Sequence, residues 1–292
     1  SSCRHMPALF DFQTIPQLYR GLVERSASQT DAVFTYKDRD TKAWTGISWA
    51  EAQDTIESIA AWLIDQGVAP GDRVAIISEN RPEWAFMDMA TQIVGAVNVS
   101  LYTSLPADQV AYILNDSGSR ILLASTGLQI KKARAIFDTC EQLSTVVGMQ
   151  DVDDAPAWLQ GWQHMITAGK SVRETHQAEI NRRSEAVTPA DLSALIYTSG
   201  TTGNPKGVML THENFCSNAV SALSNVPFGP GDVHLSFLPL CHSFERTAGY
   251  TAILAAGGQI VYAESVDAVS RNMGEVAPTV MISVPRLFER IY

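Results

Sequence analysis

Apolar residues in the first part of the chain recur at the two spacings that distinguish helices from strands. Spacings of three and four predict a helix over Ile15–Ser26 and a second helix that begins after Ser48. Ser48 stands three residues before Glu51, which is the spacing of a capping box, and Gly67 is placed to end this helix. Between the two helices, the segments AVFTY and WTGISW flank a polar turn and predict a β-hairpin.

From Gly71 onward, short apolar runs alternate with longer helical patterns. The runs typical of buried strands cover 72–78, 97–102, 120–125 and 143–149. The helical patterns cover 81–96, 105–118 and 128–140. Pro82 and Pro106 stand in the first turn of the first two helices, where proline is well tolerated. Strands that alternate with helices in this way predict an α/β fold with a mostly parallel, helix-covered sheet.

The segment Asp151–Val187 is more polar and only weakly patterned. Trp158 and Trp162 stand four residues apart, which would place them on one helix face, although local packing is the simpler interpretation. The alternation then resumes: further strands are expected over 192–199, 233–240, 259–265 and 279–285, with an extended segment over 207–212. Further helices are expected from about Glu213, capped by Thr211 or His212, over 243–257 and 266–276, and from Arg286.

The composition narrows the class of protein. The chain has 292 residues, 46% of them apolar, and a formal net charge of −10. This charge disfavours a nucleic-acid partner, because nucleic-acid-binding domains usually carry a basic patch. The four cysteines lack CxxC spacing and no apolar run is long enough to span a membrane, so we expect a cytoplasmic location, compatible with peripheral membrane contact. Residues 1–6 have the character of an expression scar and are excluded from the fold prediction.

The segment Tyr197–Gly207, YTSGTTGNPKG, has the composition of an anion-binding loop. Its three glycines allow close approach of the backbone, and its hydroxyl and backbone N–H groups can surround an anion. Lys206 adds a compact positive charge suited to phosphate oxygens. A Walker A loop is excluded because Lys206 follows Pro205 and an extended segment, not a helix, comes next. The alternative is an ordinary surface turn.

The longer string YTSGTTGNPKGVMLTHENF resembles the phosphate-loop signature of the acyl-activating, adenylate-forming superfamily. FLPLCHSFER, residues 237–246, is similar to the next motif of that superfamily, and its Glu-Arg ending resembles the long-chain fatty acyl-CoA synthetase (AMP-forming) branch. The segments 71–102, 105–125 and 284–292 also resemble this branch, so that the resemblance covers essentially residues 7–292.

The resemblance implies an enzyme that joins a long-chain fatty acid to ATP, releases pyrophosphate and passes the acyl group from the adenylate to CoA. ATP, Mg²⁺ and CoA are the substrates and cofactors that it implies. The residues implied to bind the phosphates are Thr198, Ser199, Gly200, Thr201, Thr202, Gly203 and Lys206. Lys206 and His242 would be catalytic, and His242 would lie beside the acyl carboxylate. No metal site made by the protein alone is expected.

Several of these residues keep a second interpretation. His242 could be a structural histidine at a strand-to-helix corner. Glu245 and Arg246 would either shape the acyl entrance or serve as a helix-end charge and a surface ion pair. Arg246 stands where some bacterial relatives place a gating tryptophan, which argues against such a gate here. The Ala- and Gly-rich helix that follows would leave room for an acyl tunnel or pack closely on its neighbours.

The resemblance also implies two packed, helix-covered sheets. Residues 71–206 would form a first subdomain, and residues 7–70 together with 207–292 a second, incomplete one. The segments for adenine and ribose and the lysine-bearing C-terminal domain are not found before Tyr292, so we expect an N-terminal portion that does not turn over ATP alone. Two alternatives remain open: an adenylate-forming ligase for another carboxylic acid, and a non-catalytic module that binds a nucleotide or phosphate. The oligomeric state is not predicted.

Overall fold

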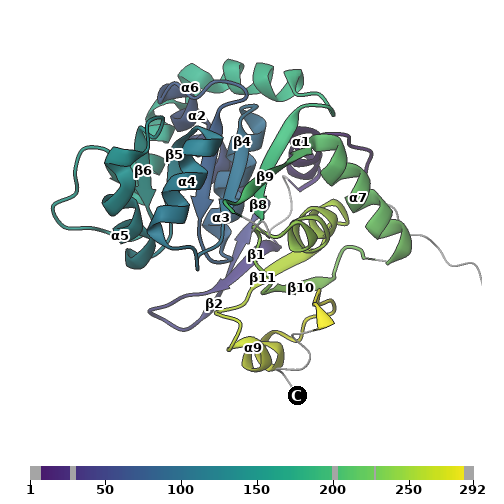
Figure 1. The fold of residues 1–292 in the computed structure, drawn as a ribbon. Helices are drawn as coiled ribbons and strands as arrows, with labels where there is room; N and C mark the ends of the chain where they lie inside the picture. Colours follow the sequence, from purple (N-terminus) through teal and green to yellow (C-terminus); the bar gives the residue numbers. More distant parts are fainter. Residues whose placement is uncertain (1–7, 27–30, 199–202, 227, 286–292) are drawn as a thin grey trace, which may run out of the picture.

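Two β-sheets with helices between and outside them make up the computed structural model, which describes residues 8–26, 31–198, 203–226 and 228–285 (Figure 1). The larger sheet has seven strands in the order β7-β6-β5-β3-β4-β8-β9. All neighbours in it are parallel except β8 and β9. Its strands are β3 (Arg73–Ile77), β4 (Val97–Leu101), β5 (Ser119–Ala124), β6 (Thr145–Gly148), β7 (Leu159–Gly161), β8 (Leu192–Thr198) and β9 (Lys206–Thr211).

The smaller sheet joins the two ends of the described chain. Its four strands lie in the order β10-β11-β1-β2, and their bounds are β1 (Ala32–Lys37), β2 (Trp44–Ser48), β10 (Val233–Ser236) and β11 (Gln259–Tyr262). The predicted hairpin is the antiparallel pair β1 and β2, while β1 pairs with β11 in parallel. Segments more than two hundred residues apart therefore share one sheet, with Phe34 opposite Ile260.

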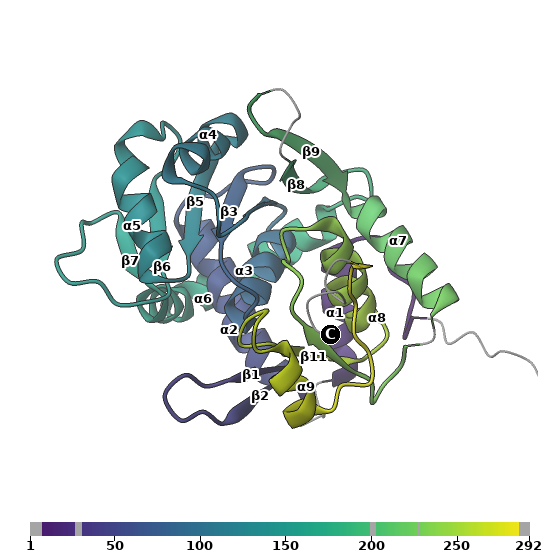
Figure 2. The same ribbon diagram turned by 60° about the horizontal axis from the view of Figure 1, so that its bottom comes forward.

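Helices form three layers around the two sheets (Figures 1 and 2). They are α1 (Ile15–Ser26), α2 (Trp49–Asp65), α3 (Pro82–Ile93), α4 (Ala107–Ser117), α5 (Gly127–Ile136), η1 (Phe137–Thr139), α6 (Trp162–Ala186), α7 (His212–Asn225), η2 (Glu245–Ala252), α8 (Ile253–Ala255) and α9 (Val269–Val276). Helices α4 and α5 cover the outer face of the larger sheet. The first three helices, η2 and α8 pack between the sheets, and α9 covers the outer face of the smaller one.

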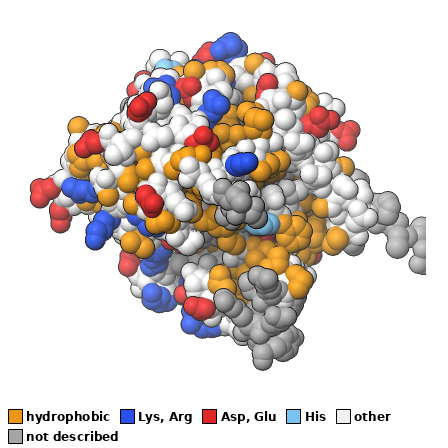
Figure 3. Space-filling model, viewed as in Figure 1, with side chains coloured by type: hydrophobic (Ala, Val, Ile, Leu, Met, Phe, Trp, Pro, Cys, Tyr) orange, Lys and Arg blue, Asp and Glu red, His pale blue; other side chains and the backbone are white. Residues whose placement is uncertain are grey.

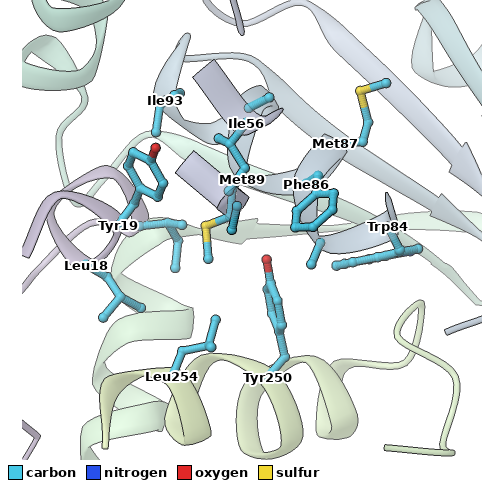
Figure 4. Packing of buried hydrophobic residues seen from close by; sticks show 14 of the residues in the cluster. Leu18, Tyr19, Ile56, Trp84, Phe86, Met87, Met89, Ile93, Tyr250 and Leu254 are labelled. Carbon is cyan, nitrogen blue, oxygen red and sulfur yellow. The ribbon is translucent and has the colours of Figure 1, made fainter. Parts of the chain in front are cut away.

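The middle layer holds the largest hydrophobic core. Figure 4 shows Tyr250 and Leu254 facing Trp84, Phe86 and Met89 of α3. The rings of Trp84 and Tyr250 meet edge to face with centroids 5.5 Å apart, which is a favoured geometry for aromatic pairs. This contact packs η2, which precedes β11 of the smaller sheet, against α3, which joins β3 and β4 of the larger one.

Most predicted elements are present at or near their expected positions. The capping box is confirmed: Ser48 accepts from the backbone N–H of Glu51, and the Glu51 carboxylate accepts from the backbone N–H of Ser48. Thr211 caps α7, which is one of the two residues that the sequence offered. The expected helix over 243–257 is present, with its first two turns wound as the π-helix η2.

Three expectations need correction or stay untested. The weakly patterned segment holds the long helix α6, and Trp158 lies outside that helix, stacked on Phe137 with ring centroids 3.9 Å apart. The one-face interpretation of Trp158 and Trp162 is therefore wrong, and local packing is confirmed for Trp158. The strand expected over 279–285 is reduced to a single bridge between His234 and Val280. The helix expected from Arg286 lies outside the described residues.

The larger sheet continues beyond residue 206 because β9 pairs with β8. The division into subdomains 71–206 and 7–70 plus 207–292 stays a prediction. None of the helices in the described part of the chain has both the length and the hydrophobicity that a membrane span requires. Figure 3 shows acidic and basic side chains interspersed on one face, with patches of hydrophobic side chains between them.

Candidate functional site

The glycine-rich segment connects two antiparallel strands. Tyr197 pairs with Gly207 and Thr198 with Lys206, so β8 and β9 form a hairpin whose last pair stands at the two ends of the glycine-rich segment. Thr198 and Lys206 are both exposed. Gly203 has a φ angle of +144°, which residues with a side chain rarely adopt. Four of the predicted phosphate ligands lie outside the described residues, namely Ser199, Gly200, Thr201 and Thr202.

A buried tyrosine anchors the base of this loop. The Tyr197 hydroxyl donates to Asp116 Oδ2 at 2.7 Å, which ties β8 to the end of α4. Burial, followed by the hydrogen bond to Asp116, raises the pKa of Tyr197, so that the hydroxyl stays a donor at neutral pH. The strand before the loop is therefore held in place from the outer helix layer.

His242 lies at an exposed corner between β10 and η2. The backbone N–H of Phe244 donates to His242 Nδ1 at 3.2 Å. Since Nδ1 accepts this bond, the neutral ring carries its proton on Nε2. The backbone N–H of His242 donates to the carbonyl of Pro239 at 2.9 Å, which tightens the corner. An exposed imidazole with its proton on Nε2 can donate a hydrogen bond to a carboxylate, as the resemblance implies.

Glu245 opens η2 but is fully buried. Its Oε1 accepts from the Ser236 hydroxyl at 2.8 Å and lies 2.8 Å from His234 Nε2. Its Oε2 is buried without a hydrogen-bond partner among the described residues. A Cβ atom at Gly249 would lie 2.2 Å from Oε1, so close packing explains this glycine of the small-residue helix. The carboxylate is thus enclosed by η2 and β10, and its role toward an acyl chain stays a prediction.

Arg246 is buried as well, so the surface-ion-pair interpretation is wrong. Its Nη2 donates to Asp88 Oδ1 at 2.7 Å, and its Nη1 donates to Asn98 Oδ1 at 3.0 Å. The guanidinium lies over the rings of Trp84 and Phe215, 5.3 and 4.9 Å from their centroids. An arginine can be buried here because a carboxylate, an amide and two aromatic faces replace its hydration.

Asp88 is the centre of a hydrogen-bond network that sequence reasoning missed. Besides Arg246, it accepts from the Tyr250 hydroxyl at 3.0 Å, from Gln92 Nε2 at 3.1 Å and from Asn98 Nδ2 at 3.0 Å. Gln92 in turn exchanges hydrogen bonds with Ser193 of β8. The available signal was a set of polar residues inside the apolar runs AFMDMATQ and VNVSL, where an unpaired polar group would be costly.

A second asparagine joins the His242 corner to the larger sheet. Asn80 follows β3; its Nδ2 donates to the carbonyl of Leu238 at 2.6 Å and to the Ser236 hydroxyl at 3.0 Å. Its Oδ1 accepts from the backbone N–H of Leu240 at 3.1 Å. β3, β4 and β8 are adjacent and parallel, so their carboxyl ends share one edge. The corner and the hairpin loop are therefore at the same edge of the larger sheet, where α/β folds place ligands.

A cavity of about 230 Å³ lies at the carboxyl ends of strands from both sheets. Cys241 lines it directly before His242, and burial raises the pKa of this thiol to about 12, so that it stays protonated. The described residues that line it are Ser78, Glu79, Asn80, Tyr102, Thr103, Ser236, Phe237, Pro239, Cys241, Ala263, Glu264, Ser265 and Val266.

Nearly the whole chain matches one known protein family. The family described as AMP-binding enzyme matches residues 22–292. This chain belongs to the AMP-binding enzymes. The predicted adenylate-forming resemblance is thereby confirmed at the level of the family.

Curated relatives of this AMP-binding enzyme include acyl-CoA ligases. It is 35% identical to long-chain-fatty-acid–CoA ligase FadD15 of Mycobacterium tuberculosis, covering 85% of this chain and 40% of that protein. It is 34% identical to fatty acyl-CoA synthetase A of Dictyostelium discoideum, and the match covers 84% of this chain and 37% of that protein. It is 30% identical to long-chain-fatty-acid–CoA ligase 5 of Rattus norvegicus, and the match covers 97% of this chain and 42% of that protein. The chain spans about two fifths of the length of these relatives.

Solved structures confirm the fold of this AMP-binding enzyme. A fatty acyl CoA synthetase of Mycobacterium tuberculosis superposes with a TM-score of 0.73 at 22% identity, covering 96% of this chain and 51% of that one. The anthranilate CoA ligase AuaEII superposes with a TM-score of 0.75 at 17% identity, and the match covers 94% of this chain and 50% of that one. The predicted α/β fold with two helix-flanked sheets is confirmed by the strand order and by these superpositions.

The described part of the site in this AMP-binding enzyme places Lys206, at the end of the β8–β9 hairpin, and the exposed His242 corner at one edge of the larger sheet. Lys206 is the positive charge that β9 presents at the loop, and His242 Nε2 is a donor at the neighbouring corner. Within the described ranges, no group of three or more His, Cys, Asp or Glu side chains is placed to hold a metal ion. A lysine ammonium and an imidazole N–H are groups that can bind anionic oxygens, and the assignment of phosphate and carboxylate ligands to them stays a prediction.

Proposed function

We propose that this AMP-binding enzyme is part of a ligase that activates long-chain fatty acids with ATP and transfers them to CoA. The observation that carries the proposal is the phosphate-loop string on the β8–β9 hairpin, at the same sheet edge as the His242 corner. The names of the curated relatives support a long-chain fatty acid as the substrate.

In the first step, a carboxylate oxygen of the fatty acid attacks the α-phosphorus of ATP. A new P–O bond forms, and the bond to the β-phosphate breaks to release pyrophosphate. Mg²⁺, when bound to the phosphate oxygens, neutralises part of their charge. Lys206 and the loop hydroxyls would bind the β- and γ-phosphates and follow the charge that develops on the leaving pyrophosphate.

In the second step, the CoA sulfur attacks the acyl carbonyl of the adenylate. A C–S bond forms, the C–O bond to AMP breaks, and the thiol proton is released. His242 Nε2–H would donate to the carboxylate during adenylation and to the acyl-adenylate afterwards. A donor in this position orients the reacting oxygen and reduces its repulsion from the phosphates.

The substrate class is tested by AMP formation with a panel of acids. The protein expressed from its complete reading frame is assayed with ATP, Mg²⁺, CoA and acetate, octanoate, hexadecanoate, benzoate or amino acids. We expect kcat/KM for hexadecanoate to exceed that for acetate and benzoate by at least about 100-fold, since each buried methylene contributes roughly 0.8 kcal/mol. A preference for a short, aromatic or amino acid would replace the long-chain assignment. ATP binding without AMP formation from any acid would favour the non-catalytic module.

A further inference from the structure

The His242 corner, residues 237–244, is held to the larger sheet on both sides of the histidine. On one side, Asn80 makes its three hydrogen bonds to Ser236, Leu238 and Leu240. On the other side, Arg246 follows the corner and is fixed by Asp88. The backbone N–H of Arg246 donates to the carbonyl of His242 at 3.1 Å, so the anchored arginine contacts the histidine's own backbone.

Both anchoring residues come from one connection in the larger sheet. Asn80 and Asp88 lie within the segment between β3 and β4 that contains α3. The same α3 carries Gln92, which exchanges hydrogen bonds with Ser193 of β8 at 3.0 and 2.9 Å. A continuous set of hydrogen bonds therefore joins β8, the strand that leads into the phosphate loop, to the backbone beside His242.

The buried pair of Asp88 and Arg246 contributes little to the stability of the fold, which points to another role. Asp88 and Arg246 have side chains that are only 2% and 3% exposed. Burying such a pair gains little stability over a well-packed apolar pair, because desolvation offsets the attraction between the charges. The buried pair instead fixes the relative orientation of η2 and α3, because the guanidinium fork of Arg246 finds its acceptors in one arrangement only.

We propose that Asn80 and Asp88 are positioning residues that hold the His242 corner in register with the phosphate loop. This inference rests on the proposed function, in which the corner handles the carboxylate and the loop handles the phosphates. The reacting carboxylate oxygen and α-phosphorus are then brought together by two elements from different sheets. A shift of about 1 Å between such elements can lower a rate by about 100-fold.

Asn115 provides a matched control for Asn80. Its Nδ2 donates to the carbonyl of Thr139 at 2.9 Å, and its Oδ1 accepts from the backbone N–H of Glu141 at 3.1 Å. It thus joins a neighbouring loop by the same kinds of bond as Asn80. It lies near the end of α4, three residues before the C-cap Gly118, and its two partners belong to the segment that leads into β6 at the amino end of the strands.

The test compares Asn80→Ala with Asn115→Ala in the protein expressed from its complete reading frame. Hexadecanoate-dependent ATP–pyrophosphate exchange gives kcat and the KM values for ATP and hexadecanoate, well below the unfolding temperature. We expect Asn80→Ala to lower kcat by about 10- to 100-fold with both KM values within about 3-fold of wild type. Asn115→Ala is expected to keep kcat within about 2-fold, whatever its effect on thermal stability.

Arg246→Lys tests the second anchor and covers the case in which Asn80→Ala does not fold. Lysine keeps the positive charge but cannot bond Asp88 and Asn98 with one planar fork, so we expect about a 10-fold lower kcat with unchanged KM values. Normal kcat in both variants, or a rise in KM alone, would overturn the positioning role while leaving the proposed function intact. A folded wild-type protein without acid-dependent exchange would instead contradict the proposed function itself.

Discussion

Lys206 is the positive charge that the structure presents where the phosphate loop returns to the sheet. It begins β9, directly opposite Thr198, and its side chain is exposed. In the proposed reaction it meets charge that develops on the phosphates during adenylation, whereas that charge has left with pyrophosphate before CoA attacks. The lysine should therefore matter far more to the first half-reaction than to the second.

We expect Lys206→Ala to slow adenylation by about 100-fold, the usual effect of removing one preorganised charge-stabilising donor. Transfer from preformed acyl-adenylate to CoA should slow by less than about 3-fold, as measured by rapid-quench kinetics on each half-reaction. Lys170→Ala is the control, because Lys170 is an exposed residue of α6 paired with Asp54. Equal losses in both half-reactions would argue against a phosphate role for Lys206.

His212 begins α7 and is buried, with Nδ1 accepting from the backbone N–H of Ile15 at 3.1 Å. Burial lowers its pKa to about 4, while the nearby charges of Asp191 and Arg246 act in opposite directions, Asp191 raising the pKa and Arg246 lowering it. The unfolded chain takes up a proton below about pH 6.5, whereas the folded chain does so only near pH 4. Stability from the neutral ring is therefore complete above pH 6.5 and lost as the pH falls toward 4.

Urea unfolding of the wild type and of His212→Asn tests this linkage. The asparagine keeps an acceptor near the Nδ1 position but does not titrate. We expect the wild type to lose up to about 3 kcal/mol more than the variant between pH 7 and pH 4. Parallel pH profiles for the two proteins would show that His212 is not held neutral by burial.

The sequence indicated which residues near His242 matter, but it did not indicate what surrounds them. The string FLPLCHSFER identified Glu245 and Arg246 as residues of interest. Arg246 was expected in a surface ion pair as one alternative, yet it is buried, because Asp88 and Asn98 supply partners from another segment of the chain. A linear pattern cannot reveal a charge partner more than a hundred residues away, so the network and the role of Asn80 required the structure.

At the scale of elements, α6 depends on close contact with α2. Gly169 of α6 lies where a Cβ atom would approach the carbonyl oxygen of Ser58 to 2.0 Å. The neighbour is backbone and cannot move without displacing α2. The glycine therefore sets the distance between the two helices.

Gly169→Ala should destabilise the protein by about 1–3 kcal/mol, the typical effect of forcing an extra carbon into a packed interface. The matched control is Gly274→Ala in α9, where a Cβ atom would meet nothing within 4 Å. There, alanine should raise stability by up to about 1 kcal/mol through its better helix propensity. Thermal unfolding of both variants provides the comparison, and an unchanged midpoint for Gly169→Ala would refute the close-contact interpretation.

Elements with strong local signals were predictable, and those that depend on distant partners were not. Helix α1 was predicted with its observed bounds because its buried residues follow one stripe. Helix α6 was missed because only a few of its residues are buried, so that its sequence carries little periodicity. The strand expected over 279–285 reduces to one bridge at Val280, since an apolar run does not by itself create a pairing partner.

At the scale of the whole molecule, local pattern predicted an α/β fold but not its topology. The parallel pairing of β1 with β11 brings together segments from the two ends of the described chain. No periodicity encodes such a pairing, and the expectation of two sheets came from the resemblance to adenylate-forming enzymes. The candidate site lies where segments that follow strands of both sheets meet, as Asn80 and Leu240 do. Its geometry therefore also depends on this long-range pairing.

The central claim is that the β8–β9 loop and the His242 corner together adenylate a fatty acid. Exchange of labelled pyrophosphate into ATP, without CoA, tests it most directly in the protein expressed from its complete reading frame. We expect exchange that requires both hexadecanoate and Mg²⁺ and that falls by about 100-fold in Lys206→Ala. Folded protein that binds ATP but shows no exchange, or exchange that is the same with and without hexadecanoate, would contradict it.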